Sequence, residues 1–434
     1  MSHVLIVSPD YASHYFPLSA VGASLQQLGH RVSVATGTAL EQVVRGDGFE
    51  HMNLVLGPGS NPGIIRPETQ SKEERMQLNA FFEATRHGMV ATLLHQAANR
   101  QRDLLFEPER VAKDLEKVLD EVAPDIVLVD QLAFGATAAL RGLGQPFVSF
   151  HPGHPSAIST AAPYGFPIHL PSRIAVDLEG LAELRRICEE VVDRFTREYN
   201  DVVAGLGNRA APVANAFAEG SPVLTLVNYP SVLGRPHRLP RTSRMIGSAV
   251  RRDRVSSSPA KSSSTDVPRI YASLGSFFSS RSDLLRKIVS AFKAQPVELI
   301  IASGATDPAE LGPIPDHWTV EPYLPQPTVI AVSDLVITHG GNNTVTESLT
   351  AGVPLLVAPL STDQFAAAAD VEFSDVGKVF DPNNDEAATI SDLAFEVLSG
   401  GAVERSASLG RSLRARPGQE WAASLIATAS HAPG

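Results

Sequence analysis

The sequence predicts two α/β domains, each built on a doubly wound parallel sheet. Short, β-branched apolar runs recur along the chain, and each is followed by a segment with a helical pattern. Runs of this kind are typical of strands buried on both faces, and their alternation with helices indicates parallel βαβ units. The predicted strands are 4–8, 31–36, 53–56, 125–130, 147–150 and 223–227 in the first half, and 269–274, 297–302, 335–338, 354–358 and 377–380 in the second.

A polar, serine-rich segment separates the two halves. Residues 251–268 read RRDRVSSSPAKSSSTDVP, a composition typical of an exposed connection. Ligands of doubly wound sheets bind beyond the carboxyl ends of the strands, so two facing domains predict a cleft between them. The predicted organisation is an N-terminal domain at 1–235, a linker at 236–268, a C-terminal domain at 269–410 and a final helical segment at 411–434.

Composition argues against several function classes. The net charge of −11 disfavours a surface that binds nucleic acid or an anionic membrane. The sequence contains no run of about 20 apolar residues, so no membrane span is expected. The N-terminus lacks the pattern of a signal peptide, and Cys188 is the only cysteine, as is typical of a reducing compartment. We expect a soluble cytoplasmic protein, a monomer or homodimer. No metal is expected, because no Asp-x-Asp motif or Cys/His cluster with metal spacing occurs.

A glycine turn predicts an anion site in the second half. Gly340 and Gly341 follow a predicted strand, and a helix is expected to begin at Asn343 or Thr344. The first N–H groups of such a helix have no partner within the helix and, together with its dipole, attract an anion. His339 lies beside this turn, where it can donate a hydrogen bond, or a charge, to a phosphate oxygen.

Glu347 lies one turn into the same helix. Its carboxylate accepts hydrogen bonds from hydroxyls, which suits a sugar diol such as ribose. The alternative is local, because Thr344 and Glu347 have the spacing of a capping box, in which Glu347 only closes its own helix. The short glycine motif alone leaves both interpretations open.

Three further elements are predicted at the same rim. Asp363 and Gln364 follow a strand and can bind hexose hydroxyls, although Asp363 also suits a helix N-cap. Tyr323 can stack on a base, although its segment also fits an ordinary turn before Pro325. Ser276 ends another strand in a turn that offers N–H and hydroxyl donors. Together these elements fit a base, ribose, diphosphate and hexose, so the predicted ligand is a nucleotide sugar.

These motifs resemble those of the nucleotide-sugar-dependent glycosyltransferases of family 1, which have the GT-B fold. The plant signature runs Trp-x-Pro-Gln, His-Cys-Gly-Trp-Asn-Ser with Glu three residues on, Gly-Val-Pro and Asp-Gln. Over most of 269–381 this chain has, in the same order, Tyr323-Leu-Pro-Gln326, His339-Gly-Gly-Asn-Asn-Thr344, Glu347, Gly352-Val-Pro354 and Asp363-Gln364. Tyr323 replaces the plant Trp, which leaves the base open between UDP and dTDP donors. The Asn-Ala that often follows Asp-Gln is absent.

The resemblance implies roles for these residues and for the domains. The C-terminal domain binds the donor, the N-terminal domain binds the acceptor, and the last helix returns to the N-terminal domain. Tyr323 and Gln326 flank the base, Glu347 holds the ribose, Ser276, His339, Asn343 and Thr344 hold the diphosphate next to Gly341, and Asp363 and Gln364 hold the sugar.

The family also has a His-x-x-Pro pattern after the first strand, which His14 and Pro17 match. By resemblance His14, placed in the loop before a helix, is the catalytic base. Asp130, which ends its own strand at the same rim, orients the imidazole and raises its basicity. From the residues alone, His14 also fits a solvated loop histidine and Asp130 a helix cap. His30, His151 and His154 have no such pairing and are taken as structural by default.

The acceptor site is the least defined part of the sequence. Phe81 and Phe82 lie in a helical stretch, where they either pack locally or line an apolar acceptor pocket. The loop at 151–171 is unusually long and rich in Pro, Gly and His, and loops of this length are usually functional or disordered. His151, at its start, is a further candidate acceptor contact.

The predicted function is an inverting glycosyltransferase that moves a sugar from a nucleoside-diphosphate donor to a small, largely apolar natural product. Two alternatives remain. One is a nucleotide-sugar epimerase on the same fold, which needs no acceptor pocket. The other is a non-catalytic relative that activates a partner enzyme and that is expected to lack His14 or the pair Asp363 and Gln364.

Overall fold

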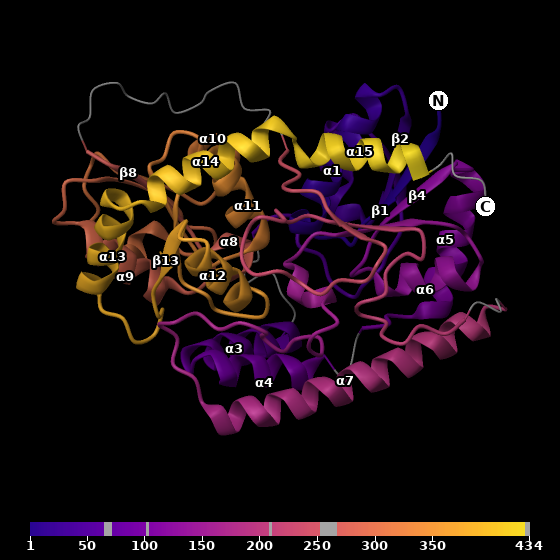
Figure 1. Ribbon diagram of the computed structural model, residues 1–434, viewed down its shortest axis with the longest axis horizontal. Helices are drawn as coiled ribbons and strands as arrows, with labels where there is room; N and C mark the ends of the chain where they lie inside the picture. Colours follow the sequence, from indigo (N-terminus) through magenta and orange to yellow (C-terminus); the bar gives the residue numbers. More distant parts are fainter. Residues whose placement is uncertain (65–71, 101–103, 208–210, 252–266, 430–434) are drawn as a thin grey trace.

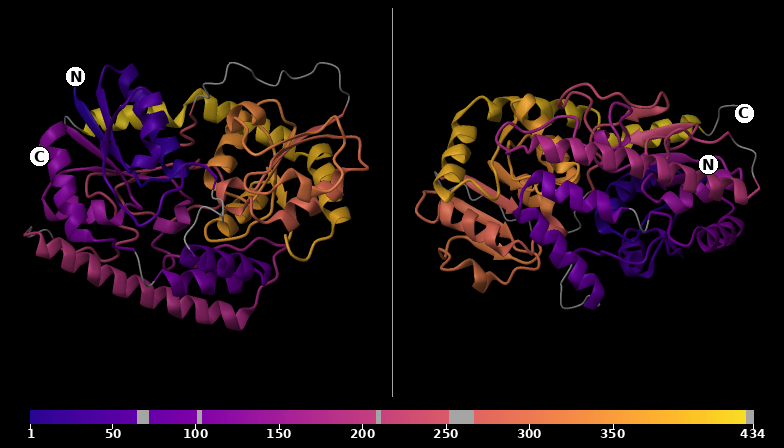
Figure 2. Two further views of the ribbon diagram at one scale, coloured as in Figure 1. Left: turned by 180° about the vertical axis from the view of Figure 1, so that it is seen from behind. Right: turned by 90° about the horizontal axis from the view of Figure 1, so that it is seen from below.

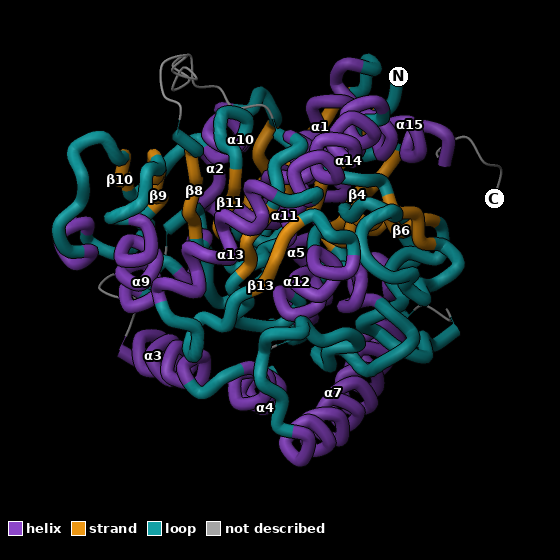
Figure 3. The backbone as a smooth tube through the Cα atoms, turned by 60° about the vertical axis from the view of Figure 1, so that its left-hand side comes forward, coloured by secondary structure: helices purple, strands orange, loops and turns teal. Residues whose placement is uncertain are grey.

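A computed structural model describes residues 1–64, 72–100, 104–207, 211–251 and 267–429. Two sheets form the framework, with strand orders β3-β2-β1-β4-β5-β6-β7 and β10-β9-β8-β11-β12-β13, and every pairing between neighbouring strands is parallel. Figure 2 shows the two α/β lobes side by side, and Figure 3 shows β10, β9, β8 and β11 in sequence across the second sheet. The predicted fold class is confirmed.

The strands match the apolar runs where these lie in the sheet interior. The first sheet comprises β1 (His3–Val7), β2 (Arg31–Thr36), β3 (Glu50–Asn53), β4 (Ile126–Asp130), β5 (Val148–His151), β6 (Leu224–Val227) and β7 (Ser243–Met245). The second comprises β8 (Arg269–Ser273), β9 (Glu298–Ala302), β10 (Thr319–Glu321), β11 (Leu335–Thr338), β12 (Leu355–Val357) and β13 (Gly377–Val379).

The edge strands differ from the sequence prediction. β3 ends where the strand predicted at 53–56 begins, and the short strands β7 and β10 were not predicted. Each of these three lies at a sheet edge and is only partly buried, so it lacks the apolar run that marks a central strand. β7 also lies inside the predicted linker 236–268, of which residues 252–266 fall outside the described ranges.

Helices cover both faces of each sheet. They are α1 (Ala12–Gln27), α2 (Glu41–Gly46), α3 (Lys72–Arg86), α4 (Met89–Asn99), α5 (Pro108–Val122), α6 (Phe134–Gly142), α7 (Leu178–Gly205), α8 (Gly275–Phe278), α9 (Ser282–Phe292), α10 (Gln326–Ile330), α11 (Asn342–Ala351), α12 (Gln364–Phe373), α13 (Ala387–Ser399), α14 (Ala402–Ala415) and α15 (Gly418–Ala429). Short 3₁₀ helices occupy Thr38–Leu40, Pro155–Ile158 and Pro308–Leu311. No helix within the described ranges is long and apolar enough to cross a membrane.

The chain connects the lobes by more than its linker. α15 packs on α1, and its buried residues Ala422 and Ile426 join the core of the first sheet (Figure 1). In the other direction, α3 packs on the C-terminal domain, because Phe81 and Phe82 contact Phe277 and belong to the core of the second sheet. Segments from each half of the sequence therefore stabilise the other lobe.

Candidate active site

His14 and Asp130 form a close pair at the rim of the first sheet. Nδ1 of His14 lies 2.8 Å from Oδ2 of Asp130, while Oδ1 of Asp130 accepts a hydrogen bond from the N–H of Leu132 at 2.8 Å. The His14 side chain is 22 % exposed and that of Asp130 is fully buried. Burial lowers the pKa of His14, but the charge and hydrogen bond of Asp130 outweigh it, so that this pKa lies above its ordinary value.

The position of His14 corrects one detail of the prediction. α1 begins at Ala12, so His14 lies in its first turn and not in the preceding loop, and Pro17 lies inside the helix. No capping residue marks this start in the sequence, because the N-cap residue is Tyr11, whose side chain makes no capping hydrogen bond. Pro17 suggested a later start, since proline is most common in the first turn.

Pro17 also exposes a carbonyl that links the two domains. Proline has no N–H, so the carbonyl of Ser13 lacks the helical donor that residue 17 would otherwise supply. Nδ2 of Asn343, at the start of α11, lies 2.8 Å from that carbonyl oxygen. The helix that carries His14 is therefore hydrogen-bonded to the helix predicted to bind the diphosphate.

Glycines at and near the turn before α11 leave room for the ring of His339. A Cβ atom on Gly275 or Gly341 would lie 2.7 Å or 2.5 Å from the His339 ring, so only glycine allows this approach. Burial lowers the pKa of His339 to about 4. His339 is therefore neutral near pH 7 and offers a hydrogen bond rather than a charge. The N-cap residue of α11 is Gly341, which has no side chain to cap the helix. The first N–H groups of α11, which lie at the cleft, therefore have no side-chain cap.

Glu347 does not cap its own helix. α11 begins at Asn342, so Thr344 lies inside the first turn and the capping-box interpretation is wrong. Oε2 of Glu347 instead accepts a hydrogen bond from Nε2 of Gln326 at 2.7 Å. This contact joins α10 to α11 and brings together two residues predicted to hold the base and the ribose.

Asp363 and Gln364 differ in how far their side chains are available to a ligand. Gln364 is buried, and its Oε1 accepts hydrogen bonds from the N–H groups of Leu360 and Ser361, both at 3.0 Å, while its Nε2 donates to Ser361. Its side chain thus mainly holds its own turn. Asp363 makes no cap to α12, and its Oδ2 accepts a hydrogen bond from the backbone N–H of His154 at 3.2 Å. Its other carboxylate oxygen remains open to a ligand.

A cleft of about 900 Å³ lies between the domains and collects most of the predicted residues. Its described lining includes His14, His151 and every predicted donor residue, namely Ser276, Tyr323, Gln326, His339, Gly341, Asn343, Thr344, Glu347, Asp363 and Gln364. Asp130 lies behind His14. Phe81 and Phe82 are not among the lining residues, because their helix packs into the core of the C-terminal domain. Burial lowers the pKa of His151, whose Nε2 lies 3.1 Å from the carbonyl oxygen of His154.

Several residues of the cleft were not predicted. Asn61 reaches across the domain boundary, with Nδ2 3.3 Å from the hydroxyl of Ser276. Nδ2 of Asn342 lies 3.0 Å from the carbonyl oxygen of Asn228 in the other domain. Arg251 donates to the Tyr323 hydroxyl at 2.9 Å. These contacts join residues far apart in sequence, and only the Asn-Pro-Gly turn at Asn61 gives a local signal, which indicates a turn and not a role.

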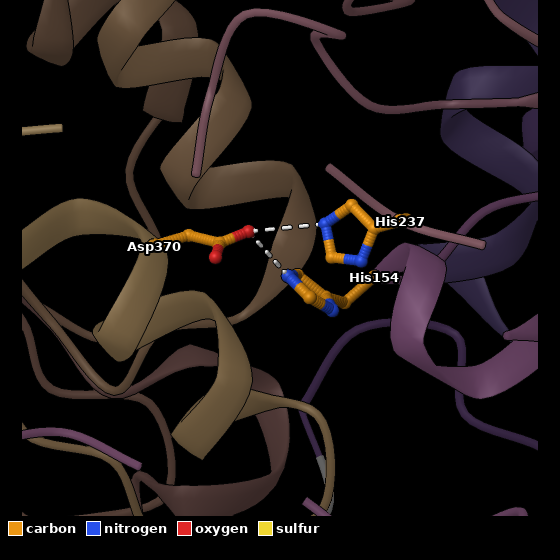
Figure 4. A group of neighbouring side chains, drawn as sticks. All are labelled: His154, His237 and Asp370. Atoms are coloured by element: carbon orange, nitrogen blue, oxygen red, sulfur yellow. Dashed lines mark hydrogen bonds and ion pairs between the residues drawn. The ribbon is translucent and has the colours of Figure 1, made fainter. Parts of the chain in front are cut away.

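A second histidine–aspartate group, His154, His237 and Asp370, is buried where the domains meet (Figure 4). Its ligand types suit a metal, but the hydrogen bonds favour another interpretation. The N–H of Ser156 donates to Nδ1 of His154 at 3.1 Å, so the hydrogen of the neutral ring is on Nε2, which lies 3.0 Å from Oδ2 of Asp370. An Nε2 that carries hydrogen cannot ligate a metal. We therefore describe this group as an interdomain hydrogen-bonded latch.

Three donors converge on one oxygen of the latch. Oδ2 of Asp370 accepts from His154, from the hydroxyl of Tyr229 at 2.9 Å and from Nε2 of His237 at 3.3 Å. Burial alone would raise the pKa of Asp370, but the hydrogen bonds from both histidines hold it well below its usual range. His154, taken from the sequence as structural, thus connects the loop that contacts Asp363 to α12.

Comparison with known proteins agrees with the fold. Residues 240–389 match the family model described as UDP-glucoronosyl and UDP-glucosyl transferase. The zeaxanthin glucosyltransferase of Pseudescherichia vulneris is 27 % identical over 387 residues, which cover 87 % of this chain and 86 % of that protein. The second half of the chain thus resembles this family, and most of its length is similar to a named glucosyltransferase.

Further relatives and solved structures extend the comparison. The 4'-demethylrebeccamycin synthase of Lentzea aerocolonigenes is 25 % identical over 401 residues, 87 % of each chain. The crystal structure of the glycotransferase of kitacinnamycin matches with a TM-score of 0.69 at 22 % identity and covers 99 % of both chains. The spinosyn rhamnosyltransferase SpnG with spinosyn aglycone gives a TM-score of 0.66 at 18 % identity over 99 % of both chains, a likeness of fold. The zeaxanthin relative is named as a glucosyltransferase, so the epimerase and activator alternatives gain no support from it.

Proposed function

We propose that this glycosyltransferase inverts the anomeric centre and uses His14 as its general base. The observation that carries the proposal is the His14–Asp130 pair, which opens into the cleft lined by the predicted donor residues. A carboxylate can only accept hydrogen bonds, so in the neutral ring Nδ1 carries the hydrogen and Nε2 carries a lone pair. Among the described residues, none hydrogen-bonds Nε2 of His14, so this nitrogen is open to an acceptor hydroxyl.

The reaction is a single displacement. Nε2 of His14 takes the proton of the acceptor hydroxyl as its oxygen bonds to the anomeric carbon, and the bond from that carbon to the diphosphate oxygen breaks. The electron pair leaves with the nucleoside diphosphate, and attack from the opposite face inverts the configuration. The positive end of α11 and the neutral His339 stabilise the developing charge. In this scheme the chain's own groups support the leaving group, and no metal ion is required.

The substrates follow from the cleft and the relatives together. We propose a UDP or dTDP sugar as donor and a small, largely apolar natural product as acceptor. By their names, one relative glucosylates zeaxanthin and another makes 4'-demethylrebeccamycin, and the cleft has room for a donor and an acceptor. One copy of the chain contributes both sides of the cleft, so a monomer suffices for activity. We place the enzyme in the cytoplasm, where its single cysteine stays reduced; burial raises the pKa of Cys188 to about 11.

Calorimetry and product analysis test this proposal. We expect UDP or dTDP to bind more tightly than GDP, and an α-linked donor to give a β-linked product by nuclear magnetic resonance. Retention of configuration, or no affinity for any of the three nucleotides, contradicts it.

A further inference from the structure

Arg100, the C-cap residue of α4, places a guanidinium in the cleft on the side of the N-terminal domain. Its Cζ lies 4.8 Å from the centre of the Tyr164 ring, and Tyr164 in turn stacks on Phe217 with ring centres 4.1 Å apart. Tyr164 belongs to the long loop at 151–171 and also lines the cleft. The guanidinium therefore rests on a supported aromatic face.

The loop is shaped to leave room for this guanidinium. Gly165 has a φ of +87°, and a Cβ atom there would lie 2.1 Å from Nη1 of Arg100. A side chain at this position would displace the guanidinium as well as strain the backbone. The arginine thus occupies a formed niche between Tyr164 and Gly165.

Arg100 has no acidic partner within the described residues. The other arginine that lines the cleft, Arg251, is bonded to Tyr323 on the donor side. Of the carboxylates that line the cleft, Glu347 accepts from Gln326 and Oδ2 of Asp363 from the N–H of His154, and no ion pair among the described residues joins either one to Arg100. When an apolar acceptor displaces water from the cleft, the charge of Arg100 loses hydration, which is unfavourable unless the acceptor supplies an anion.

We propose that the acceptor carries a carboxylate, which Arg100 binds at a distance from the hydroxyl that receives the sugar. The planar guanidinium matches a carboxylate with two parallel hydrogen bonds. One unit of negative charge balances one arginine, whereas a phosphate monoester would bring nearly two. The body of the acceptor is apolar, because Phe166 and Ala157 of the same loop line the cleft. This inference rests on the proposed function and specifies its acceptor class.

Matched acceptors test the proposal. The probes are 4-hydroxycinnamic acid and 16-hydroxyhexadecanoic acid, each compared with its primary amide in transfer assays at saturating donor. For the wild-type enzyme we expect at least one acid to exceed its amide about tenfold or more in kcat/KM, mainly through KM, because a charge-assisted pair is lost in the amide. In Arg100→Gln this acid-to-amide ratio falls to about one, and in Arg100→Lys it is partly retained.

Arg185→Gln is the matched control. Its guanidinium also lies over a ring of the same loop, 5.2 Å from the centre of Phe166, but it is paired with Glu189. We expect this variant to keep the wild-type acid-to-amide ratio. A ratio near one for both wild-type pairs, or a ratio that Arg100→Gln leaves unchanged, overturns the proposal.

Saturation-transfer nuclear magnetic resonance with UDP present separates the two levels of failure. If the amides bind and are glycosylated while the acids have no advantage, only the carboxylate site is wrong. If UDP binds but neither acid binds better than its amide, the carboxylate site is likewise wrong, whatever the transfer assay shows. If neither UDP nor dTDP binds and no probe is glycosylated, the proposed function fails as well.

Discussion

Two histidine–aspartate pairs of similar geometry lie in this molecule, and they differ in what surrounds the second ring nitrogen. In His14–Asp130 the two side chains meet at 2.8 Å, and in His154–Asp370 at 3.0 Å; each aspartate is almost fully buried. His14 opens to the cleft through Nε2. His154 is itself buried, and the backbone N–H of Ser156 occupies its remaining nitrogen.

This difference separates a base from a structural contact. Asp130 raises the pKa of His14, and an imidazole needs an accessible lone pair to receive a proton from a substrate. In His154 both nitrogens are already hydrogen-bonded, so the pair can only hold the domains together. A close His–Asp pair is therefore a weak indicator of catalysis unless the hydrogen-bond partners and the exposure of the second ring nitrogen are also known.

The largest effect is expected on removing the open imidazole. His14→Ala eliminates the general base, which typically contributes about 10²–10⁴-fold, so kcat should fall by about that factor. Donor affinity should change little, because the donor residues lie in the other domain. Steady-state kinetics and calorimetry with UDP measure the two quantities. His30→Ala, outside the described cleft lining, is the control, and transfer by His14→Ala at the wild-type rate contradicts the assignment.

Weakening the same pair should cost less activity than removing His14 and should also shift the pH dependence of the reaction. His14 must be neutral to act, and its pKa is raised, so wild-type kcat/KM should fall as pH decreases through an apparent pKa above about 6.5. Asp130→Asn removes the charge that raises this pKa, and burial then lowers it, so the acidic limb should move to lower pH. Activity at the optimum should fall about 10²-fold. A limb that stays in place in pH–rate profiles would show that another group controls it.

The sequence could predict residues that lie in local motifs, but not the contacts between the domains. The predicted donor residues lie in short motifs near the ends of strands, and the order of these motifs resembles that of the family, so the sequence predicted His339, Glu347 and Asp363 at one rim. The contacts between domains have no such pattern. Asn343 reaches the carbonyl of Ser13, and His154 reaches Asp370, across more than two hundred residues of chain.

The packing of Phe81, Phe82 and Gln364 shows the same limit of prediction from sequence. Helical periodicity predicts that Phe81 and Phe82 are buried in a helix, but not that this helix packs on the opposite domain. The motif that includes Gln364 says nothing of the two backbone N–H groups that occupy its side-chain oxygen. Tertiary packing decides both outcomes.

The latch should affect stability more than chemistry. Asp370→Asn keeps an acceptor oxygen for His154 but removes the charge, and weakening a buried charged hydrogen bond costs about 1–3 kcal/mol in free energy of unfolding. The pKa of Asp370 is depressed, so its stabilising contribution is present above the unfolded value of about 3.9 and decreases as pH falls below it. Denaturant unfolding at several pH values measures this. Asp375→Asn, on an exposed carboxylate, is the control, and equal loss in both variants contradicts the latch.

The smallest effect should come from the Ser156 hydroxyl. Its oxygen lies 2.9 Å from Nδ1 of His154, but the backbone N–H of the same residue already fixes the position of the ring hydrogen. Ser156→Ala keeps that N–H, so the free energy of unfolding should change by less than about 1 kcal/mol. Ser156→Pro removes the N–H and leaves Nδ1 without its backbone donor, so a larger loss is expected. If the alanine variant is as unstable as the proline variant, the hydroxyl rather than the amide sets the tautomer, and the distinction between the two pairs requires another basis.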